Sequence, residues 1–92
     1  MVPIKHLSNQ YRFNIVIDGK EAFLQYRKLP DNVWEYAHTF VPQDFRHKGI
    51  GEDIVKFALD FARENHIKVR PTCPFVQHYL ETHHEYDDLI VE

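Results

Sequence analysis

The sequence contains little cysteine, no long apolar run and no large excess of charge of either sign. Cys73 is the only cysteine in 92 residues, so no disulfide can form within the chain. No apolar run approaches the roughly 20 residues that a bilayer-spanning helix needs. The first ten residues, MVPIKHLSNQ, lack the apolar core of a secretory signal. We therefore expect a cytoplasmic protein without membrane contact.

Charge and composition narrow the class further. The formal net charge is −3 at pH 7, which gives no overall basic field to hold nucleic acid. Hydrophobic residues make up 43% of the chain and aromatic residues 14%, which is typical of a globular protein rather than a disordered one. Because we find neither an internal repeat nor a linker, we expect residues 1–92 to form a single domain with one modest core.

Three segments in the first half of the chain show the period-two alternation that is typical of strands. The first covers residues 11–18 and ends at Asp18-Gly19, which is a hairpin turn signal. The second covers residues 21–29, and a turn at 30–32 leads to the third, at 33–41. In the third segment the alternation places four side chains on one face: Trp34, Tyr36, His38 and Phe40.

After the third strand the pattern becomes helical. A helix is predicted from Ile50 to Asn65, and a fourth strand is predicted over 66–73 with Ile67 and Val69 inward. A short second helix is predicted over 74–84, and residues 86–92 form either a last short strand or a docked tail. Helical spacing gives the first helix an apolar stripe of five residues: Ile50, Ile54, Phe57, Ala58 and Phe61.

This order of elements predicts an α+β fold. Three strands form an antiparallel meander, and the third strand, the long helix and the fourth strand form a crossover that requires one parallel pair. The result is a compact mixed sheet with two main helices. Where a parallel pair begins, ligands tend to bind at the carboxyl ends of the strands.

The segment FRHKGIGED, residues 45–53, lies between the third strand and the long helix. Gly49 and Gly51 lack a Cβ, so an anion could approach the backbone closely beside the first amides of the helix. Arg46, His47 and Lys48 add positive charge there. The segment is either a phosphate cradle or an ordinary turn with solvated basic residues, since a lone G-x-G does not decide between them. It has neither the third glycine of a dinucleotide-binding fingerprint nor the G-K-[ST] of a Walker loop.

The motif RHKGIG, residues 46–51, matches the signature [RQ]-x-x-G-x-[GA], and the chain around it resembles the GNAT superfamily of acyl-CoA-dependent N-acetyltransferases. HTFV (38–41), the glycine loop, PTCPFV (71–76) and HEY (84–86) follow one another as in a small, single-domain branch of YjdJ type. The resemblance covers residues 33–90 clearly and the two earlier strands loosely.

The resemblance implies a GNAT-like fold, acetyl-CoA as acyl donor and an amine, on a small molecule or a protein, as acceptor. It implies that the edge of the third strand at Phe40 and Val41 pairs with the pantetheine arm, and that Cys73 lies near the acetyl thioester. It also implies that the loop amides hold the pyrophosphate, over the residues Arg46, His47, Lys48, Gly49, Ile50 and Gly51.

Two residues are candidates for catalysis, and each has a structural alternative. Cys73 is either a small buried side chain or a nucleophile placed before Pro74 at a helix start. His38 is either a hydrogen-bonded structural residue or a general base or substrate contact. Many members of the superfamily place a glutamate on this strand; here Phe40 stands near that place and Glu35 lies further back. The identity of the base is therefore open.

Two functions follow from these observations. The first is an acetyl-CoA-binding N-acetyltransferase that transfers an acetyl group to an amine, directly or through Cys73. The second is a non-catalytic acyl-CoA-binding or protein-interaction module on the same fold. The chain is shorter than ordinary members of the superfamily, so the acceptor side would be open or completed by dimerisation, and we expect a monomer or a weak dimer. No metal is expected, because Cys73, His78, His83 and His84 follow no common zinc spacing.

Overall fold

The computed structural model describes residues 3–92 and shows one five-stranded mixed sheet. The strands lie side by side in chain order, with antiparallel pairing except between β4 and β5, which are parallel. The antiparallel meander and the single parallel crossover pair are thereby confirmed. The described strands are β1 (Lys5–Leu7), β2 (Arg12–Ile17), β3 (Lys20–Leu29), β4 (Val33–Phe40) and β5 (Lys68–Pro71).

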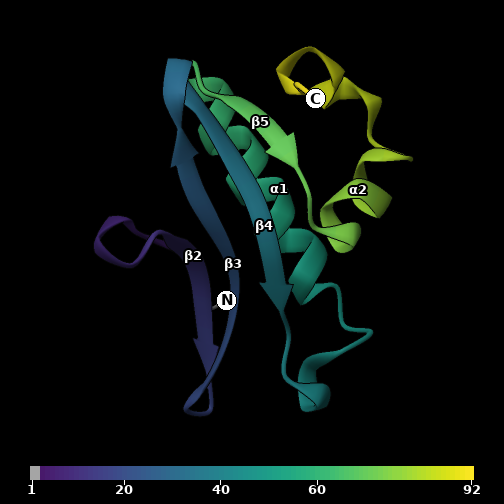
Figure 1. Cartoon of the computed structure of the whole chain (residues 1–92). Helices are drawn as coiled ribbons and strands as arrows, with labels where there is room; N and C mark the ends of the chain where they lie inside the picture. Colours follow the sequence, from purple (N-terminus) through teal and green to yellow (C-terminus); the bar gives the residue numbers. More distant parts are fainter. Residues whose placement is uncertain (1–2) are drawn as a thin grey trace.

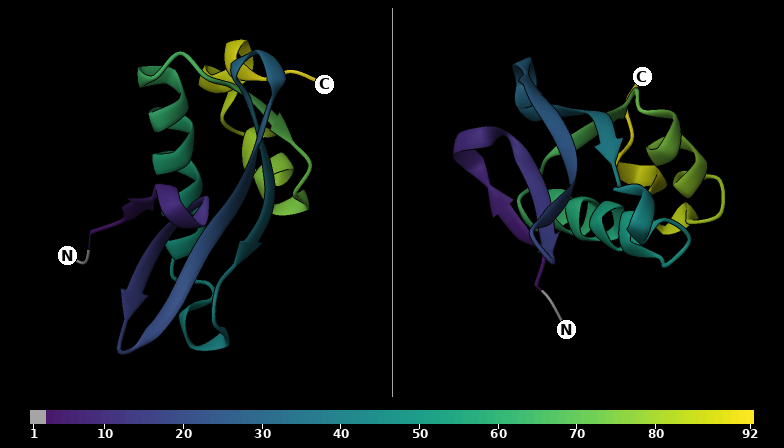
Figure 2. Two further views of the ribbon diagram at one scale, coloured as in Figure 1. Left: turned by 60° about the vertical axis from the view of Figure 1, so that its left-hand side comes forward. Right: turned by 90° about the horizontal axis from the view of Figure 1, so that it is seen from below.

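Two α-helices, α1 (Ile50–Glu64) and α2 (Pro74–Leu80), accompany the sheet. Figure 1 looks onto the sheet with α1 behind the strands, and α2 and the C-terminal segment beside β5. In neither view of Figure 2 does a helix cover the opposite side of β2 and β3. Among residues 3–92, no helical layer covers this face of the sheet, which we call the outer face. Within residues 3–92, no helix is both long and apolar enough to cross a membrane.

The core lies between α1 and the inner face of the sheet. From the strands, Phe13, Leu24 and Tyr36 are fully buried, and the Tyr36 hydroxyl donates a hydrogen bond of 2.6 Å to the Ala58 carbonyl of α1. The predicted stripe of α1 was partly wrong, because Phe57 is 37% exposed and lies at the margin of the core. The buried residues of α1 are Gly51, Ile54, Val55, Ala58, Leu59 and Ala62.

A β-bulge interrupts β4 at Ala37. Gln25 of β3 lies opposite His38, while the next residue, Tyr26, lies opposite Tyr36, so Ala37 is an extra residue in β4. A single inserted residue reverses the side to which the following side chains point. The prediction that Trp34, Tyr36, His38 and Phe40 share one face was therefore wrong. The first two are buried, whereas His38 and Phe40 are exposed.

The parallel pairing of β4 and β5 ends at Tyr36 and Pro71. There the amides of Thr72 and Cys73 both donate to the Tyr36 carbonyl, at 3.3 and 3.2 Å. The chain beyond them turns into α2, so the last residues of β4 have β3 as their only neighbouring strand in the described sheet. The two parallel strands thus separate just beyond the bulge.

Two terminal segments differ from the sequence-based expectation. β1 was not predicted, because its three residues are too few to show an alternation. Residues 86–92 do not form a strand: a 3-10 helix covers His84–Leu89, and the tail then docks on β5. The Val91 amide donates a hydrogen bond of 2.9 Å to the Val69 carbonyl, which corresponds to the docked-tail alternative.

Candidate functional site

A pocket of about 310 Å³ lies where the end of β4 meets the start of α1. We call it the loop pocket, because the glycine loop, residues 46–51, forms much of its wall. Seven of the eight residues predicted to bind a cofactor line it, and Lys48 does not. Its lining consists of Thr39, Phe40, Val41, Phe45, Arg46, His47, Gly49, Ile50, Gly51, Glu52 and Phe75.

The backbone of the glycine loop places free amides at the start of α1. Gly49 precedes the helix with φ of +78°, a left-handed conformation that glycine adopts without a steric penalty. The first hydrogen bond along the helix runs from the Asp53 amide to the Gly49 carbonyl, at 3.0 Å. The amides of Ile50, Gly51 and Glu52 therefore have no partner within α1. Such amides, together with the helix dipole, favour an anion.

Gly51 has a different role from Gly49, because it permits close packing. A Cβ at Gly51 would lie 2.8 Å from Cζ of Phe75 and 3.3 Å from Cγ2 of Val41. Phe75 belongs to α2 and Val41 follows β4, so the missing side chain lets three segments meet at the wall of the loop pocket. A Cβ at Gly49 would meet nothing within 4 Å, so there the need for glycine comes from the backbone angle alone.

The charges around the loop pocket are mixed rather than purely basic. Arg46 is held in place by a hydrogen bond of 3.1 Å from its Nε to the Val41 carbonyl. Glu52 contributes an acidic group to the same lining. Outside the lining, Asp44 pairs with Lys20 of the β2–β3 hairpin. The hydrogen bond and the charge of Lys20, with a smaller effect of Lys48, hold the pKa of Asp44 below its ordinary value.

Cys73 lies beside the loop pocket but does not line it. It is 4% exposed, at the junction of β5 and α2. Its thiol donates to Oγ1 of Thr39 over 3.5 Å, and Thr39 is a lining residue. The thiol makes no capping hydrogen bond to α2. Cys73 therefore contacts the end of the pocket that is formed by β4, across the gap where β4 and β5 separate.

The structure does not bring His38 together with Cys73. His38 is exposed on the outer face, whereas Thr39, the partner of Cys73, points the other way. Within residues 3–92 the His38 ring has no hydrogen-bond partner of 3.5 Å or less, and its nearest aromatic contact is Phe23, with 5.9 Å between ring centroids. The proposed catalytic roles of His38 and Cys73 remain predictions.

A group of polar contacts beside the point where β4 and β5 separate was not predicted from the sequence. We call it the Glu35 lock, and it consists of Glu35, Thr72 and Arg27. Glu35 of β4 accepts a hydrogen bond of 2.7 Å from Thr72 and bonds of 2.9 and 2.6 Å from Arg27. These contacts, that of Thr72 first, lower the pKa of Glu35 from its usual value. Thr72 precedes Cys73, so Glu35 ties the end of β5 to β4. Four residues of the pocket lining were also missed: Thr39, Phe45, Glu52 and Phe75. The bulge decides where Thr39 points, Phe75 belongs to α2, and Glu52 has a local signal in the first turn of α1.

No group of three or more His, Cys, Asp or Glu side chains within the described part of the chain could hold a metal ion.

The chain is similar to several known proteins over most of its length. Protein NATD1 from Gallus gallus is 29% identical over 82 residues, which cover 87% of this chain and 74% of that protein. Protein NATD1 from Homo sapiens is also 29% identical over 82 residues, covering 87% of this chain and 73% of that protein.

Solved structures show the same architecture. The NMR solution structure of a GCN5-like protein from Staphylococcus aureus superimposes with a TM-score of 0.77 at 29% identity, covering 98% of this chain and 88% of that one. The crystal structure of a ribosomal-protein-alanine N-acetyltransferase from Brucella melitensis biovar Abortus 2308 gives a TM-score of 0.60 at 22% identity, covering 88% and 61%. The second likeness shows the fold alone.

The family model described as GCN5-related N-acetyl-transferase matches residues 12–89, from the first residue of β2 to the end of the C-terminal 3-10 helix. This range contains HTFV, the glycine loop, PTCPFV and HEY, which are the motifs on which the resemblance was based. The chain therefore belongs to the GCN5-related N-acetyltransferase family, as a small member of the GNAT superfamily.

Proposed function

We propose that the chain is an acetyl-CoA-dependent N-acetyltransferase that transfers an acetyl group to an amine. The observation that carries this proposal is the loop pocket, in which the free amides at the start of α1 adjoin the end of β4. The family uses acetyl-CoA as its acyl donor, and the lining of the pocket suits that molecule. The proposal extends to residues 1–92 acting as a single domain, as a monomer or a weak dimer.

The residues of the loop pocket fit a diphosphate at one end and an apolar arm at the other. At the helix end, the amides of Ile50, Gly51 and Glu52 would donate to phosphate oxygens, and Arg46 and His47 supply side chains in the same lining. At the strand end, Phe40, Val41 and Phe75 offer a largely apolar wall for the pantetheine arm. Lys48, outside the lining, would contribute only its charge.

The acyl transfer itself requires little from the protein beyond positioning. A neutral amine nitrogen forms a bond to the acetyl carbon while the carbon–sulfur bond breaks, and the thiolate leaves as CoA. The amine gives up one proton, which passes to solvent or to the departing thiolate. Holding the two reactants together supplies much of the rate enhancement in such a reaction.

The position of Cys73 supports direct transfer. Its thiol is buried and hydrogen-bonded to Thr39, so it lies behind a lining residue rather than in the lining itself. In the alternative route, the Cys73 thiolate would first take the acetyl group from CoA and then pass it to the amine. Direct transfer predicts that Cys73→Ser keeps its activity, whereas the covalent route predicts that Cys73→Ser and Cys73→Ala both lose it.

One observation favours a second function, a non-catalytic acyl-CoA-binding or interaction module. The titratable residues of the loop pocket are Arg46, His47 and Glu52, and all three lie at the helix end. Within the described part of the chain, neither a carboxylate nor an imidazole lines the strand end beside Cys73. This module would bind acetyl-CoA without acetylating any member of a broad amine panel, whereas the enzyme would release free CoA with at least one of them.

Calorimetric titration with acetyl-CoA tests the pocket, and the chain offers a matched control. Gly49 and Gly19 have nearly the same φ, +78° and +77°, and a Cβ at either would meet nothing within 4 Å. Gly49→Asp places a carboxylate where phosphates would bind, whereas Gly19→Asp imposes similar backbone strain in the β2–β3 turn. We expect micromolar binding that Gly49→Asp abolishes and Gly19→Asp preserves. Equal affinities in the two variants would show that the loop is not the phosphate site.

A further inference from the structure

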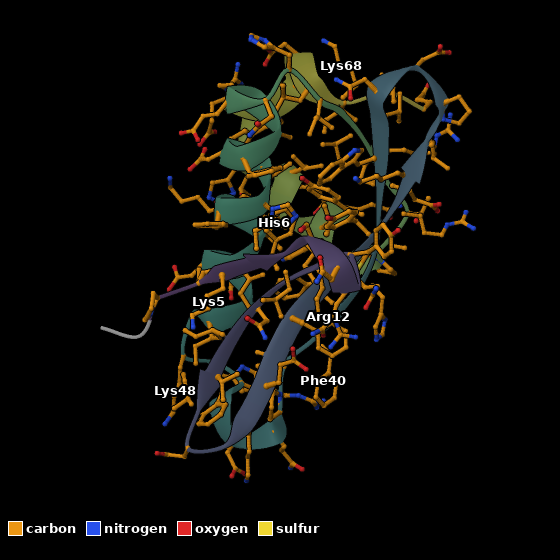
Figure 3. The ribbon with its side chains drawn as sticks, turned by 90° about the vertical axis from the view of Figure 1, so that its left-hand side faces the viewer. Lys5, His6, Arg12, Phe40, Lys48 and Lys68 are labelled. Carbon is orange, nitrogen blue, oxygen red and sulfur yellow. The ribbon has the colours of Figure 1, made fainter. Side chains whose placement is uncertain are left out.

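The edge strand β1 is short, and one histidine side chain joins it to the core. Its three residues pair with the first half of β2, opposite residues 12–14. Residues 15–17 of β2 continue along the same edge, and among residues 3–92 no strand pairs with them on that side. Lys5 is exposed, whereas His6 is half-buried and lies beside α1 (Figure 3). The attachment of β1 therefore depends strongly on His6.

Four aromatic rings from four different elements surround His6. The nearest ring centroids are those of Phe61 of α1, at 4.5 Å, and Phe13 of β2, at 4.6 Å. Tyr26 of β3 and Trp34 of β4 follow, at 5.7 and 5.9 Å. The imidazole thus occupies a place in the core where a purely apolar ring could also pack, but it brings a group that titrates near neutral pH.

The hydrogen bond of His6 depends on the protonation of its ring. Nε2 of His6 lies 2.7 Å from the hydroxyl oxygen of Tyr26, which is 1% exposed. In a neutral ring Nε2 can accept this hydrogen bond from the hydroxyl, whereas both nitrogens of a protonated ring are donors. Protonation would therefore reverse the bond and place a positive charge among the rings.

The surroundings of His6 do not balance such a charge. Within residues 3–92, no carboxylate oxygen lies within 4 Å of either His6 ring nitrogen. β2, β4 and α1 face His6 with uncharged rings, and β3 contributes the neutral Tyr26 hydroxyl and the ammonium of Lys28, which lies 5.3 Å from the Trp34 ring centroid. Burial first, and then the charge of Lys28, lower the pKa of His6 from its ordinary value of 6.5.

We propose that β1 is a pH-sensitive strap, which neutral His6 holds on the sheet and which is released when His6 takes up a proton. Because the docked ring binds a proton less tightly than a free one, docking is favoured above pH 6.5 and weakens as the pH falls below it. The attraction of a cation to ring faces acts in the opposite direction, so the measured pKa decides the sign. Release would leave residues 12–17 of β2 as an open edge, to which another strand could add.

Proton NMR of the unmodified chain between pH 8 and pH 5, the range in which histidine titrates, tests the strap. At pH 8 we expect nuclear Overhauser effects (NOEs) from the His6 ring to the rings of Phe13 and Phe61. These NOEs should disappear as His6 becomes protonated, with a midpoint below 6.5. The NOEs between Tyr26 and Trp34, whose rings stack at 4.2 Å, should persist at both pH values and show that the rest of the sheet stays folded.

Three variants separate the proton on His6 from other effects of acid, and the cross-strand backbone NOEs of the Leu7–Arg12 pair serve as the readout. In His6→Gln the amide can still accept from Tyr26 but does not titrate, so these NOEs should remain at pH 5. His78→Gln removes an exposed histidine of α2 and should behave as the unmodified chain does. Lys28→Gln removes the neighbouring positive charge, so it should raise the pKa of His6 and reduce the release in acid.

Two results in the unmodified chain would overturn the strap. If the Leu7–Arg12 NOEs persist at pH 5 while His6 is protonated, His6 has only a structural role. If the midpoint of His6 lies at or above 6.5, the rings favour the cation. Loss of the NOEs in acid alone in His6→Gln would overturn it too, since another group would then drive release. If His6→Gln leaves β1 undocked even at pH 8, Lys28→Gln decides, and an unchanged midpoint and release in that variant would contradict the proposal.

Discussion

The two halves of β4 differ in almost every respect although they belong to one strand. The first half, up to Tyr36, pairs with β3 on one side and β5 on the other, and its large rings are buried. The second half, from His38 on, has lost β5 as a neighbour and exposes its rings on the outer face. Ala37, the bulge residue, separates them.

This difference shows how one inserted residue divides a strand between stability and function. The first half contributes Trp34 and Tyr36 to the core and the Glu35 contact to β5. The second half is no longer paired with β5, which leaves a gap between the two strands. The loop pocket and Cys73 lie next to this gap, on the inner side of the sheet. The following predictions test whether the division is as sharp as the geometry indicates.

The largest effect is expected from a comparison of two substitutions in β4, one of which should lower the free energy of unfolding and the other the affinity for acetyl-CoA. Tyr36→Ala removes a fully buried ring and its hydrogen bond to Ala58, and should lower the free energy of unfolding by about 3–5 kcal/mol. Phe40→Ala removes a ring that is 41% exposed, so its effect on stability should be small, while acetyl-CoA affinity falls because Phe40 lines the pocket.

Urea denaturation of both variants, with calorimetry of Phe40→Ala, provides the measurement. A loss of stability in Phe40→Ala as large as that in Tyr36→Ala would contradict the division of the strand, since it would mean that both halves serve the core equally.

A second, smaller effect is expected at Gly51, where the pocket wall depends on close packing. Gly51→Ala would bring a Cβ to 2.8 Å from the ring tip of Phe75, so that ring must shift and the shape of the pocket that it lines must change. Replacing glycine by alanine within a helix gains roughly 1 kcal/mol, which offsets the strain, so stability should change little. We expect acetyl-CoA affinity to fall about tenfold, equivalent to about 1.4 kcal/mol.

The double variant Gly51→Ala with Phe75→Leu provides the rescue, because the shorter side chain vacates the space that the new Cβ needs. Calorimetric titration should show affinity partly restored. If the double variant binds no better than Gly51→Ala alone, the packing explanation for Gly51 is wrong.

The features that the sequence revealed are those with a local signal. Alternation identified β2, β3 and β4, helical spacing identified α1, and the glycines with Arg46 and His47 located the loop pocket. The parallel pair followed from the order of the elements, because a strand, a helix and a further strand of that length leave few other arrangements.

The features that the sequence concealed depend on contacts between distant segments. Ala37 continues the alternation without interruption, so nothing local marks it as an inserted residue; its effect appears only in the register with β3. Phe75 reaches the pocket wall because α2 packs beside α1, which no spacing in the sequence encodes. His38 was consequently assigned to the wrong face, and the contact between Cys73 and Thr39 was not foreseen.

The smallest expected effect concerns pH and tests the lock on the first half of β4. Because Thr72 and Arg27 lower the pKa of Glu35 in the folded state, the ionised carboxylate stabilises the fold at pH values above its unfolded pKa, about 4.5. This contribution is lost as the pH falls through the lower folded pKa. Glu35→Gln should therefore reduce stability at pH 7, and the difference from the unmodified chain should shrink in acid.

Urea denaturation between pH 7 and pH 3 measures that difference, and Glu64→Gln, at an exposed position in the last turn of α1, serves as the control. Because Thr72 adjoins Cys73, loosening the lock should also disturb the gap, so acetyl-CoA affinity should fall in Glu35→Gln and remain unchanged in Glu64→Gln. A stability difference that stays constant across the pH range would mean that the Glu35 carboxylate contributes no pH-dependent stability. If Glu35→Gln binds acetyl-CoA as tightly as the unmodified chain, the contacts of the first half of β4 do not affect binding at the second half. The bulge alone would then determine the geometry of the site.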